Sequence, residues 1–156
     1  MILELLDLIE PSLAPALQDE PAPALLWQAW AIPKRLCPSV QFAEDVLGCV
    51  ESDSPFQWVS VETLQDGEGG RYMQVLGSPA AMTVEIIGHF GTEIVGTLAR
   101  PGARGALVGV GGSVALSSVP VYENEVLTIV DACRVLREWV VSGRLPSGYD
   151  VRNTEY

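Results

Sequence analysis

The stretch from Gln57 to Ile87 constrains the fold most, because three short segments alternate apolar and polar residues there with turn residues between them. A period of two residues is typical of a half-buried strand. The connections at 65–70 and 77–79 are rich in glycine, aspartate, serine and proline, which tight turns need. The sequence therefore predicts an antiparallel β-meander with strands over 58–63, 71–76 and 82–87.

The alternation gives this meander two different faces. One face is apolar and is expected to be core; it carries Val59, Val61, Met73, Val75, Met82, Val84 and Ile86. The opposite face, called the outer face below, carries Trp58, Ser60, Glu62, Tyr72, Gln74, Thr83 and Glu85. Interfaces favour aromatic anchors ringed by polar groups. We therefore predict a partner-binding surface made of Trp58, Glu62, Tyr72, Gln74 and Glu85, with Asp66 and Glu68 on the first turn.

Helical patterns precede the meander. Residues 1–9 place apolar side chains on one helical stripe, and residues 40–50 do the same after a capping serine. Between them, the apolar run 24–32 is flanked by prolines and predicts a short helix with Trp27 and Trp30 on one face. That face either docks onto the domain or meets a partner or a second copy of the chain, so a homodimer is one possibility.

Strand and helix patterns follow the meander as well. Strands are expected over 92–98 and 106–110, with weaker candidates over 113–116 and 117–122. The clearest helix spans 128–142; it starts with a capping box of Thr128 and Asp131 and ends before Gly143.

The whole pattern predicts an α+β fold. At 156 residues the chain is expected to form one domain. This domain has a helical part over 1–50, an antiparallel sheet over 56–122 and a helix over 128–142. The sheet is expected to have about five to six strands, with the N- and C-terminal helices packed on one of its faces.

The charge of the chain restricts its partners. Twenty acidic residues stand against nine basic ones, which gives a net charge of −11, and Lys34 is the only lysine. Such a chain is repelled by phosphate backbones and anionic lipid, and it associates faster with a basic molecule. We therefore expect a basic protein partner, and neither nucleic acid nor a membrane.

Cysteine usage and the N-terminus indicate a cytoplasmic protein. Cys37, Cys49 and Cys133 are odd in number and lack ligand-like spacing, so neither a disulfide framework nor a metal site is predicted. Residues 1–7 carry acids where a signal peptide carries positive charges. No apolar run reaches the length of a membrane span.

The sequence contains no arrangement typical of catalysis, so we predict neither an enzyme nor a cofactor. His89 is the only histidine, and one histidine without nearby carboxylates or thiolates makes no metal site. The glycines at 109–112 separate strand-like segments and do not lead into a helix, as a phosphate-binding loop would. Glu62 and Glu85 are expected about 10 Å apart, two strand spacings, which is at or beyond the wide limit for a glycosidase pair.

Four segments of the C-terminal half carry a resemblance to a known family. They are Gly70–Val75, Met82–Ile86, Asp131–Trp139 and Gly143–Pro146. In this order they resemble the strand meander and the last helix, with its Gly-x-x-Pro-like stop, of small immunity proteins from bacterial polymorphic-toxin and contact-inhibition systems. The family is often encoded beside nucleic-acid deaminase toxins. It usually has a tryptophan soon after that proline, where this chain has Tyr149.

The resemblance implies a protein without an active site that binds a basic toxin domain and covers the toxin's active site. An inhibitory immunity-type protein is therefore the first hypothesis. A chaperone or adaptor for a secreted effector, which holds its client with the aromatic segment 24–32, is the alternative. A small ligand-binding or hydrolase domain has the least support.

Overall fold

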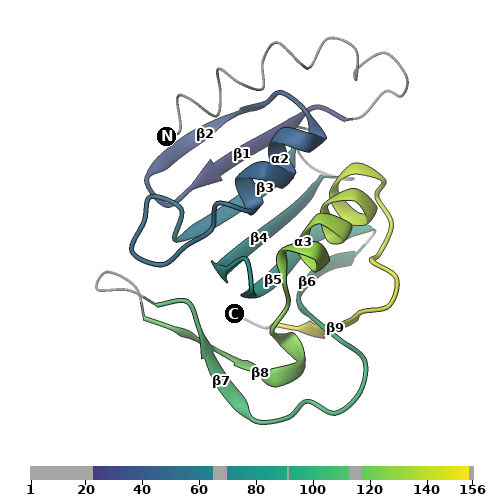
Figure 1. Cartoon of the computed structure of the whole chain (residues 1–156). Helices are drawn as coiled ribbons and strands as arrows, with labels where there is room; N and C mark the ends of the chain where they lie inside the picture. Colours follow the sequence, from purple (N-terminus) through teal and green to yellow (C-terminus); the bar gives the residue numbers. More distant parts are fainter. Residues whose placement is uncertain (1–22, 65–69, 91, 113–116, 155–156) are drawn as a thin grey trace.

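The computed structural model describes residues 23–64, 70–90, 92–112 and 117–154 (Figure 1). Its main sheet has seven strands in the spatial order β2-β1-β3-β4-β5-β6-β9, and every neighbouring pair is antiparallel. These strands are β1 (Leu25–Ala29), β2 (Ile32–Cys37), β3 (Trp58–Thr63), β4 (Arg71–Ser78), β5 (Ala81–Phe90), β6 (Thr92–Ala99) and β9 (Asp150–Asn153). The α+β class and the mainly antiparallel sheet are confirmed, and the sheet is larger than the five to six strands predicted.

The apolar face of the meander is buried as the alternation predicts. All seven of its predicted core side chains are 0% exposed, namely Val59, Val61, Met73, Val75, Met82, Val84 and Ile86. Burying one apolar side chain of this size stabilises a fold by about 1.5–3 kcal/mol. This face therefore supplies the centre of the core.

Two helical elements cover the buried face of the sheet (Figure 1). Helix α2 (Val40–Leu47) starts at Ser39, whose Oγ accepts a hydrogen bond from the Phe42 amide at 3.0 Å. Helix α3 (Ile129–Val135) continues directly as the π-helical segment η4 (Leu136–Val141). The helix α2 contacts β3, and η4 contacts β3 and β4. The outer face therefore lies on the side of the sheet away from both helices.

The prediction of a helix over residues 24–32 is wrong, because this segment forms the antiparallel hairpin of β1 and β2. Burial alternates along β1: Trp27 is 1% exposed and packs its ring 5.6 Å from that of Phe42, whereas Trp30 at the hairpin turn is 43% exposed. The two tryptophans therefore share no helical face. Alanine, leucine and glutamine favour helices intrinsically, but pairing with β3 on one side and β2 on the other overrides that preference. The predicted helix over residues 1–9 lies outside the described residues.

The last strand, β9, was not predicted. After η4 the chain turns at Gly143, whose φ of 71° is the left-handed conformation expected of a helix C-cap. It then runs back along the edge of the sheet and pairs with β6. A side chain at Gly96 would place its Cβ 2.2 Å from Val151, so the glycine allows β9 to lie this close. The strand is four residues long and polar, which is why periodicity gave no signal for it.

The next two strands after β6 lie outside the main sheet. β7 (Leu107–Val110) pairs only with β8 (Val119–Tyr122) in a separate two-stranded sheet, and the weaker candidate over 113–116 lies outside the described residues. The short helix η3 (Glu123–Glu125) returns the chain toward α3. Across the described part of the chain, no helix is both long and apolar enough to cross a membrane.

Asp131 caps the start of α3 and links it by hydrogen bonds to two segments that are distant in the sequence. Its carboxylate accepts hydrogen bonds from the Thr128 amide at 2.8 Å, from Arg100 Nη2 at 2.8 Å and from the Tyr149 hydroxyl at 2.6 Å. Partial burial acts to raise the pKa of Asp131, but the hydrogen bonds from Tyr149, Thr128 and Arg100 outweigh it and leave the pKa below 3.8. Burial and the bond to Asp131 raise the pKa of Tyr149 to about 12.

The lowered pKa of Asp131 predicts a specific loss of stability in acid. A carboxyl whose pKa is lower in the folded state stabilises the fold fully above its unfolded pKa, near 3.8, and this contribution disappears as pH falls through the folded pKa. Asp131→Asn should therefore lower the melting temperature at about pH 7 but reduce it much less at about pH 2. The exposed Glu51→Gln is the matched control. Equal destabilisation by Asp131→Asn at both pH values would contradict the assignment.

Candidate functional site

The structure brings five of the predicted binding residues together on the outer face. Strand pairing sets Glu62 opposite Tyr72 and Gln74 opposite Glu85, while Trp58 lies opposite Leu76. The five predicted side chains on the strands are all half-buried, namely Trp58, Glu62, Tyr72, Gln74 and Glu85. Asp66 and Glu68 lie outside the described residues, so their part in the predicted surface stays a prediction.

A continuous row of polar side chains crosses six strands of this face. Direct cross-strand partners form it in the order Gln28, Ser60, Gln74, Glu85, Thr97 and Arg152, from β1 to β9. Side chains paired in this way lie about 4.5–5.5 Å apart at Cβ. We call these six residues the polar row. Sequence reasoning found only its middle, because Gln28 and Arg152 belong to strands that were not predicted.

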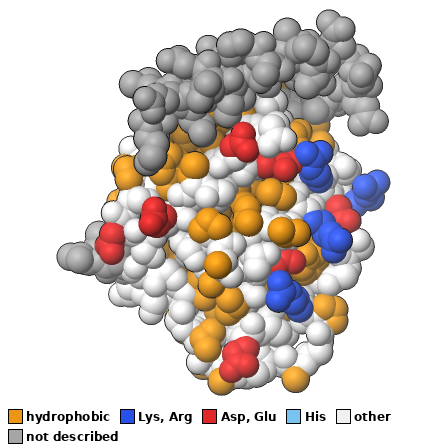
Figure 2. All heavy atoms as spheres, viewed as in Figure 1, with side chains coloured by type: hydrophobic (Ala, Val, Ile, Leu, Met, Phe, Trp, Pro, Cys, Tyr) orange, Lys and Arg blue, Asp and Glu red, His pale blue; other side chains and the backbone are white. Residues whose placement is uncertain are grey.

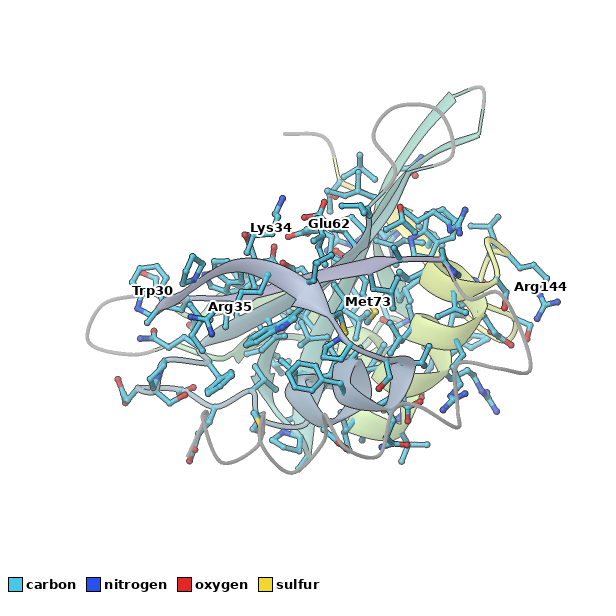
Figure 3. The ribbon with its side chains drawn as sticks, turned by 90° about the horizontal axis from the view of Figure 1, so that it is seen from above. Trp30, Lys34, Arg35, Glu62, Met73 and Arg144 are labelled. Atoms are coloured by element: carbon cyan, nitrogen blue, oxygen red, sulfur yellow. The ribbon has the colours of Figure 1, made fainter. Side chains whose placement is uncertain are left out.

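An ion pair and a hydrogen bond link further polar side chains of the outer face. Lys34 Nζ on β2 lies 2.5 Å from Glu62 Oε1, and their side chains are 47% and 24% exposed. Figure 3 shows both residues on the side of the sheet opposite Met73. The Tyr72 hydroxyl donates a hydrogen bond to Gln74 Oε1. A cation that approached Glu62 would therefore compete with Lys34, the only lysine in the chain.

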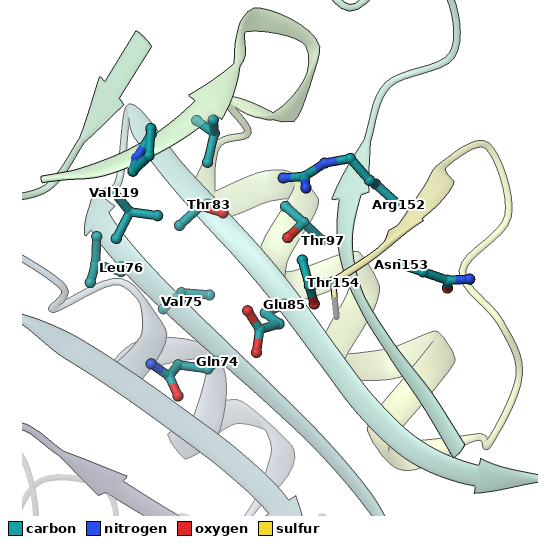
Figure 4. A pocket seen from close by; sticks show the side chains of 12 residues that line it. Gln74, Val75, Leu76, Thr83, Glu85, Thr97, Val119, Arg152, Asn153 and Thr154 are labelled. Atoms are coloured by element: carbon teal, nitrogen blue, oxygen red, sulfur yellow. The ribbon is translucent and has the colours of Figure 1, made fainter. Parts of the chain in front are cut away.

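The far end of the polar row forms the floor of an open pocket of about 490 Å³. Gln74, Glu85 and Thr97 supply polar groups from the main sheet, β8 supplies an apolar wall over 119–121, and β9 supplies Arg152 (Figure 4). Pockets of about 300–1,000 Å³ with a few convergent polar groups are the usual form of small binding sites. The pocket exists because the β7–β8 hairpin leaves the main sheet and lies beside it.

Arg152 is held at the rim of this pocket by a buried carboxylate. Glu125 on η3 is 1% exposed, and its two oxygens accept hydrogen bonds from Arg152 Nε at 2.5 Å and Nη2 at 3.0 Å. The guanidinium carbon of Arg152 lies 5.7 Å from the centroid of the Tyr122 ring, and that of Arg104 lies 5.1 Å from it. The lining of the pocket itself contains one carboxylate, Glu85, and one guanidinium group, Arg152.

Two hydroxyl groups, one in the polar row and one lining the pocket, are buried without a hydrogen-bond partner among the described residues. They are Ser60 Oγ, on a residue that is 1% exposed, and Thr154 Oγ1, which lines the pocket. Most buried polar side-chain atoms in proteins have a partner. Among the described residues, the hydrogen bonding of these two atoms is therefore incomplete.

The thiols of the described residues are poor nucleophiles at neutral pH. Burial raises the pKa of the Cys37 thiol to about 11, and burial together with the nearby Glu44 raises the pKa of Cys133 to about 11. The thiolate is the reactive form of cysteine. Within the described ranges, no group of three or more histidine, cysteine, aspartate or glutamate residues could hold a metal ion.

The helix side of the molecule carries exposed basic side chains, with acidic side chains among them. Figure 2 views this side and shows lysine and arginine side chains gathered over α3 and its neighbours. Arg100, Arg134, Arg137 and Arg144 are all exposed in this region. Two of them pair with acids, Arg100 with Asp131 and Arg137 with Glu44. Four of the nine basic residues thus lie away from the outer face.

No protein-family model matches this chain, and no curated protein is significantly similar to it.

Proposed function

We propose that this chain is an immunity-type inhibitory protein, which binds a basic bacterial toxin domain through its outer face and covers the toxin's active site. The observation that carries the proposal is the composition of that face: the half-buried aromatic side chains of Trp58 and Tyr72 lie among polar groups, next to an open pocket lined by polar and apolar side chains. Aromatic anchors surrounded by polar groups are typical of energetically important interface centres.

The net charge of the chain favours a basic partner. The chain carries a net charge of −11, yet exposed arginines gather on the helix side. A basic partner is repelled locally by those arginines and attracted by the molecule as a whole. Complementary charge mainly accelerates association and fixes orientation. A toxin domain that binds nucleic acid through a basic groove would present such a surface.

A chaperone or adaptor is the second candidate, and the β1–β2 hairpin favours it. Trp30 is 43% exposed and Leu36 is 67% exposed, so the hairpin offers apolar area to a client segment. Substitution of both residues by serine would separate the two functions. A chaperone would lose client binding, whereas an inhibitor that uses the outer face would keep its partner.

The test of the proposed function is protection of a cell. The C-terminal domain of a large secreted protein encoded beside this chain would be expressed in a bacterial host with and without the chain. We expect growth arrest by the domain alone, restored growth on co-expression and a stable complex of the two. If that domain is toxic and the folded chain neither binds it nor restores growth, the immunity assignment is wrong.

Charge reversal on the outer face should slow association with this basic partner. Exposed charge interactions are worth about 0.2–1 kcal/mol, so Glu62→Lys should reduce the association rate constant by up to about fivefold. Added salt should shrink the difference, because screening weakens exposed charges. Glu51→Lys, on the exposed turn after α2, is the matched control. Equal rates for the two variants at low salt would place the interface elsewhere.

A further inference from the structure

We infer that the pocket between the main sheet and the β7–β8 hairpin is a receptor site for a tyrosine side chain of the partner. The aromatic ring lies along the apolar end of the pocket, and the hydroxyl group reaches the polar end. This inference rests on the proposed function, since it names the side chain that anchors a partner protein on the outer face.

The two ends of the pocket differ in polarity. The apolar end is formed by Leu76 on β4 and by the segment 119–121 of β8. The polar end is formed by consecutive members of the polar row, namely Gln74, Glu85 and Thr97. Figure 4 shows Leu76 and Val119 on one side of the pocket, with Thr154 on the other. A side chain with an apolar body and a polar tip therefore matches both ends.

The charges of the lining favour a neutral side chain. One carboxylate, Glu85, and one guanidinium group, Arg152, line the pocket, so the lining has no net charge. The Arg152 guanidinium donates to both oxygens of the buried Glu125, and Glu85 also interacts within the chain. A charged side chain would lose water on entry without gaining an unpaired charge, which is unfavourable. The phenol of tyrosine is neutral below its pKa of about 10.

The polar end offers a hydrogen-bond partner for a hydroxyl group. Thr154 Oγ1 belongs to the lining, is buried and has no partner among the described residues. A phenol hydroxyl donates and accepts, as a threonine hydroxyl does, and buried tyrosine hydroxyls usually find such a partner. The tyrosine hydroxyl therefore bonds to Thr154, a contact that phenylalanine cannot make.

Apolar side chains beside the polar row favour a tyrosine that is carried by a protein. Cross-strand pairs form a second row on the outer face, namely Leu36, Leu26, Glu62, Tyr72, Ile87 and Val95. Five of these six side chains are apolar or aromatic, all six are at least half-exposed or half-buried, and Leu36 is 67% exposed. The Thr154 amide bonds to the Val95 carbonyl at 3.2 Å, so this row reaches the pocket. Interfaces surround aromatic anchors, often tyrosine, with contacts that exclude water.

A titration with single-residue probes tests the pocket without a partner. N-acetyl-L-tyrosine amide would be added to the isotopically labelled full chain, and amide chemical shifts would be followed at Leu76, Thr97 and Val121. We expect saturable shifts with a Kd on the order of 1 mM, as the size of the probe allows. N-acetyl-L-phenylalanine amide lacks only the hydroxyl group, so it should bind about two- to tenfold more weakly, the effect of one hydrogen bond. N-acetyl-L-arginine amide and N-acetyl-L-glutamate amide should bind more weakly than either.

Two variants locate the probe in the pocket. Thr154→Val removes the hydroxyl group at nearly constant volume, so it should abolish the preference for the tyrosine probe and leave binding of the phenylalanine probe unchanged. Val119→Asp places a charge at the apolar end and should weaken both probes at least tenfold. Val119 is 37% exposed, so this variant tests the site even if Thr154→Val fails to fold. Ser142→Ala is the matched control, because Ser142 is exposed at the end of η4, and both affinities should stay the same.

The possible outcomes separate this inference from the proposed function. No saturable binding of the tyrosine probe, equal binding of the phenylalanine probe, stronger binding of a charged probe, or an unchanged preference in Thr154→Val would each overturn the tyrosine site. Protection from a toxin would still stand in those cases. Conversely, a tyrosine preference that depends on Thr154, together with a failure to protect cells, would keep the site and remove the immunity assignment.

Discussion

Replacing Trp139 by alanine is expected to lower the free energy of unfolding by about 3–5 kcal/mol. Trp139 on η4 is 0% exposed, and its indole N–H donates a hydrogen bond to the Tyr72 carbonyl at 3.1 Å. The side chain thus fills the space between the last helix and the sheet and also satisfies a backbone group of β4. Chemical denaturation should show the loss, and the melting temperature should fall by about 6–20 °C.

A control substitution at Val130 and a second substitution at Gly88 test whether the loss of stability comes from the Trp139 side chain. Val130 on α3 is 76% exposed, and Val130→Ala should change stability by less than about 0.5 kcal/mol. A Cβ at Gly88 would lie 2.5 Å from Trp139 Cζ2, so Gly88→Ala should also destabilise the wild type. In the Trp139→Ala background the same glycine substitution should cost much less. Additive effects of the two changes would contradict the contact between them.

Removing either member of the Glu125–Arg152 pair is expected to destabilise the fold, by about 3–5 kcal/mol for Arg152→Ala, because this change leaves the buried Glu125 carboxylate without that partner. The Glu125 side chain is 2% exposed and that of Arg152 is 32% exposed. Glu125 also accepts a hydrogen bond from the Tyr122 amide at 3.3 Å. Glu125→Ala and Arg152→Ala should therefore both shift the denaturation midpoint strongly. Lys34→Ala, which breaks the exposed pair with Glu62, should cost at most about 1 kcal/mol.

The double variant decides whether the pair acts as a unit. Buried ion pairs replaced by apolar residues of similar volume are often neutral or stabilising. Glu125→Leu combined with Arg152→Met should therefore cost much less than the sum of the two single changes. If the double variant loses as much stability as the two single variants together, each side chain is held by contacts other than the pair.

The sequence predicted the meander because its strands alternate cleanly and one face is fully buried. Val59, Val75 and Val84 are all 0% exposed, so the period of two reflects a real difference between the faces. The last helix was predicted for a similar reason: its capping residues Thr128 and Asp131 form the expected hydrogen bond, and Gly143 has the expected left-handed backbone. Where the local residue pattern and the burial of the side chains agree, a single sequence is sufficient to predict the strand or helix.

The first hairpin and the last strand were missed because tertiary pairing decides both. The segment 24–32 has residues that favour a helix and becomes a strand only because β3 offers it an edge. The strand β9 has four residues, and its position depends on Gly96, which lies more than fifty residues earlier in the chain. Neither fact is visible in a local window of residues.

The same limits apply to the candidate site. The sequence placed Glu62, Tyr72, Gln74 and Glu85 on one face, and the strand register agrees. It gave no indication that Lys34 pairs with Glu62 or that Arg152 pairs with Glu125, because the partners come from the first hairpin and the last strand. The pocket itself also requires the β7–β8 hairpin to leave the main sheet.

The position of β9 has a consequence for biosynthesis. This strand follows all the others in the chain, so a ribosome delivers it last, and it brings Arg152 and Thr154 to the pocket. Domains begin to form during translation, at about 5–20 residues per second, before their last residues emerge. The sheet from β1 to β6 can therefore assemble on the nascent chain without a complete site. The pocket is complete only when residues 150–154 have left the ribosome, so its lining forms after the rest of the sheet.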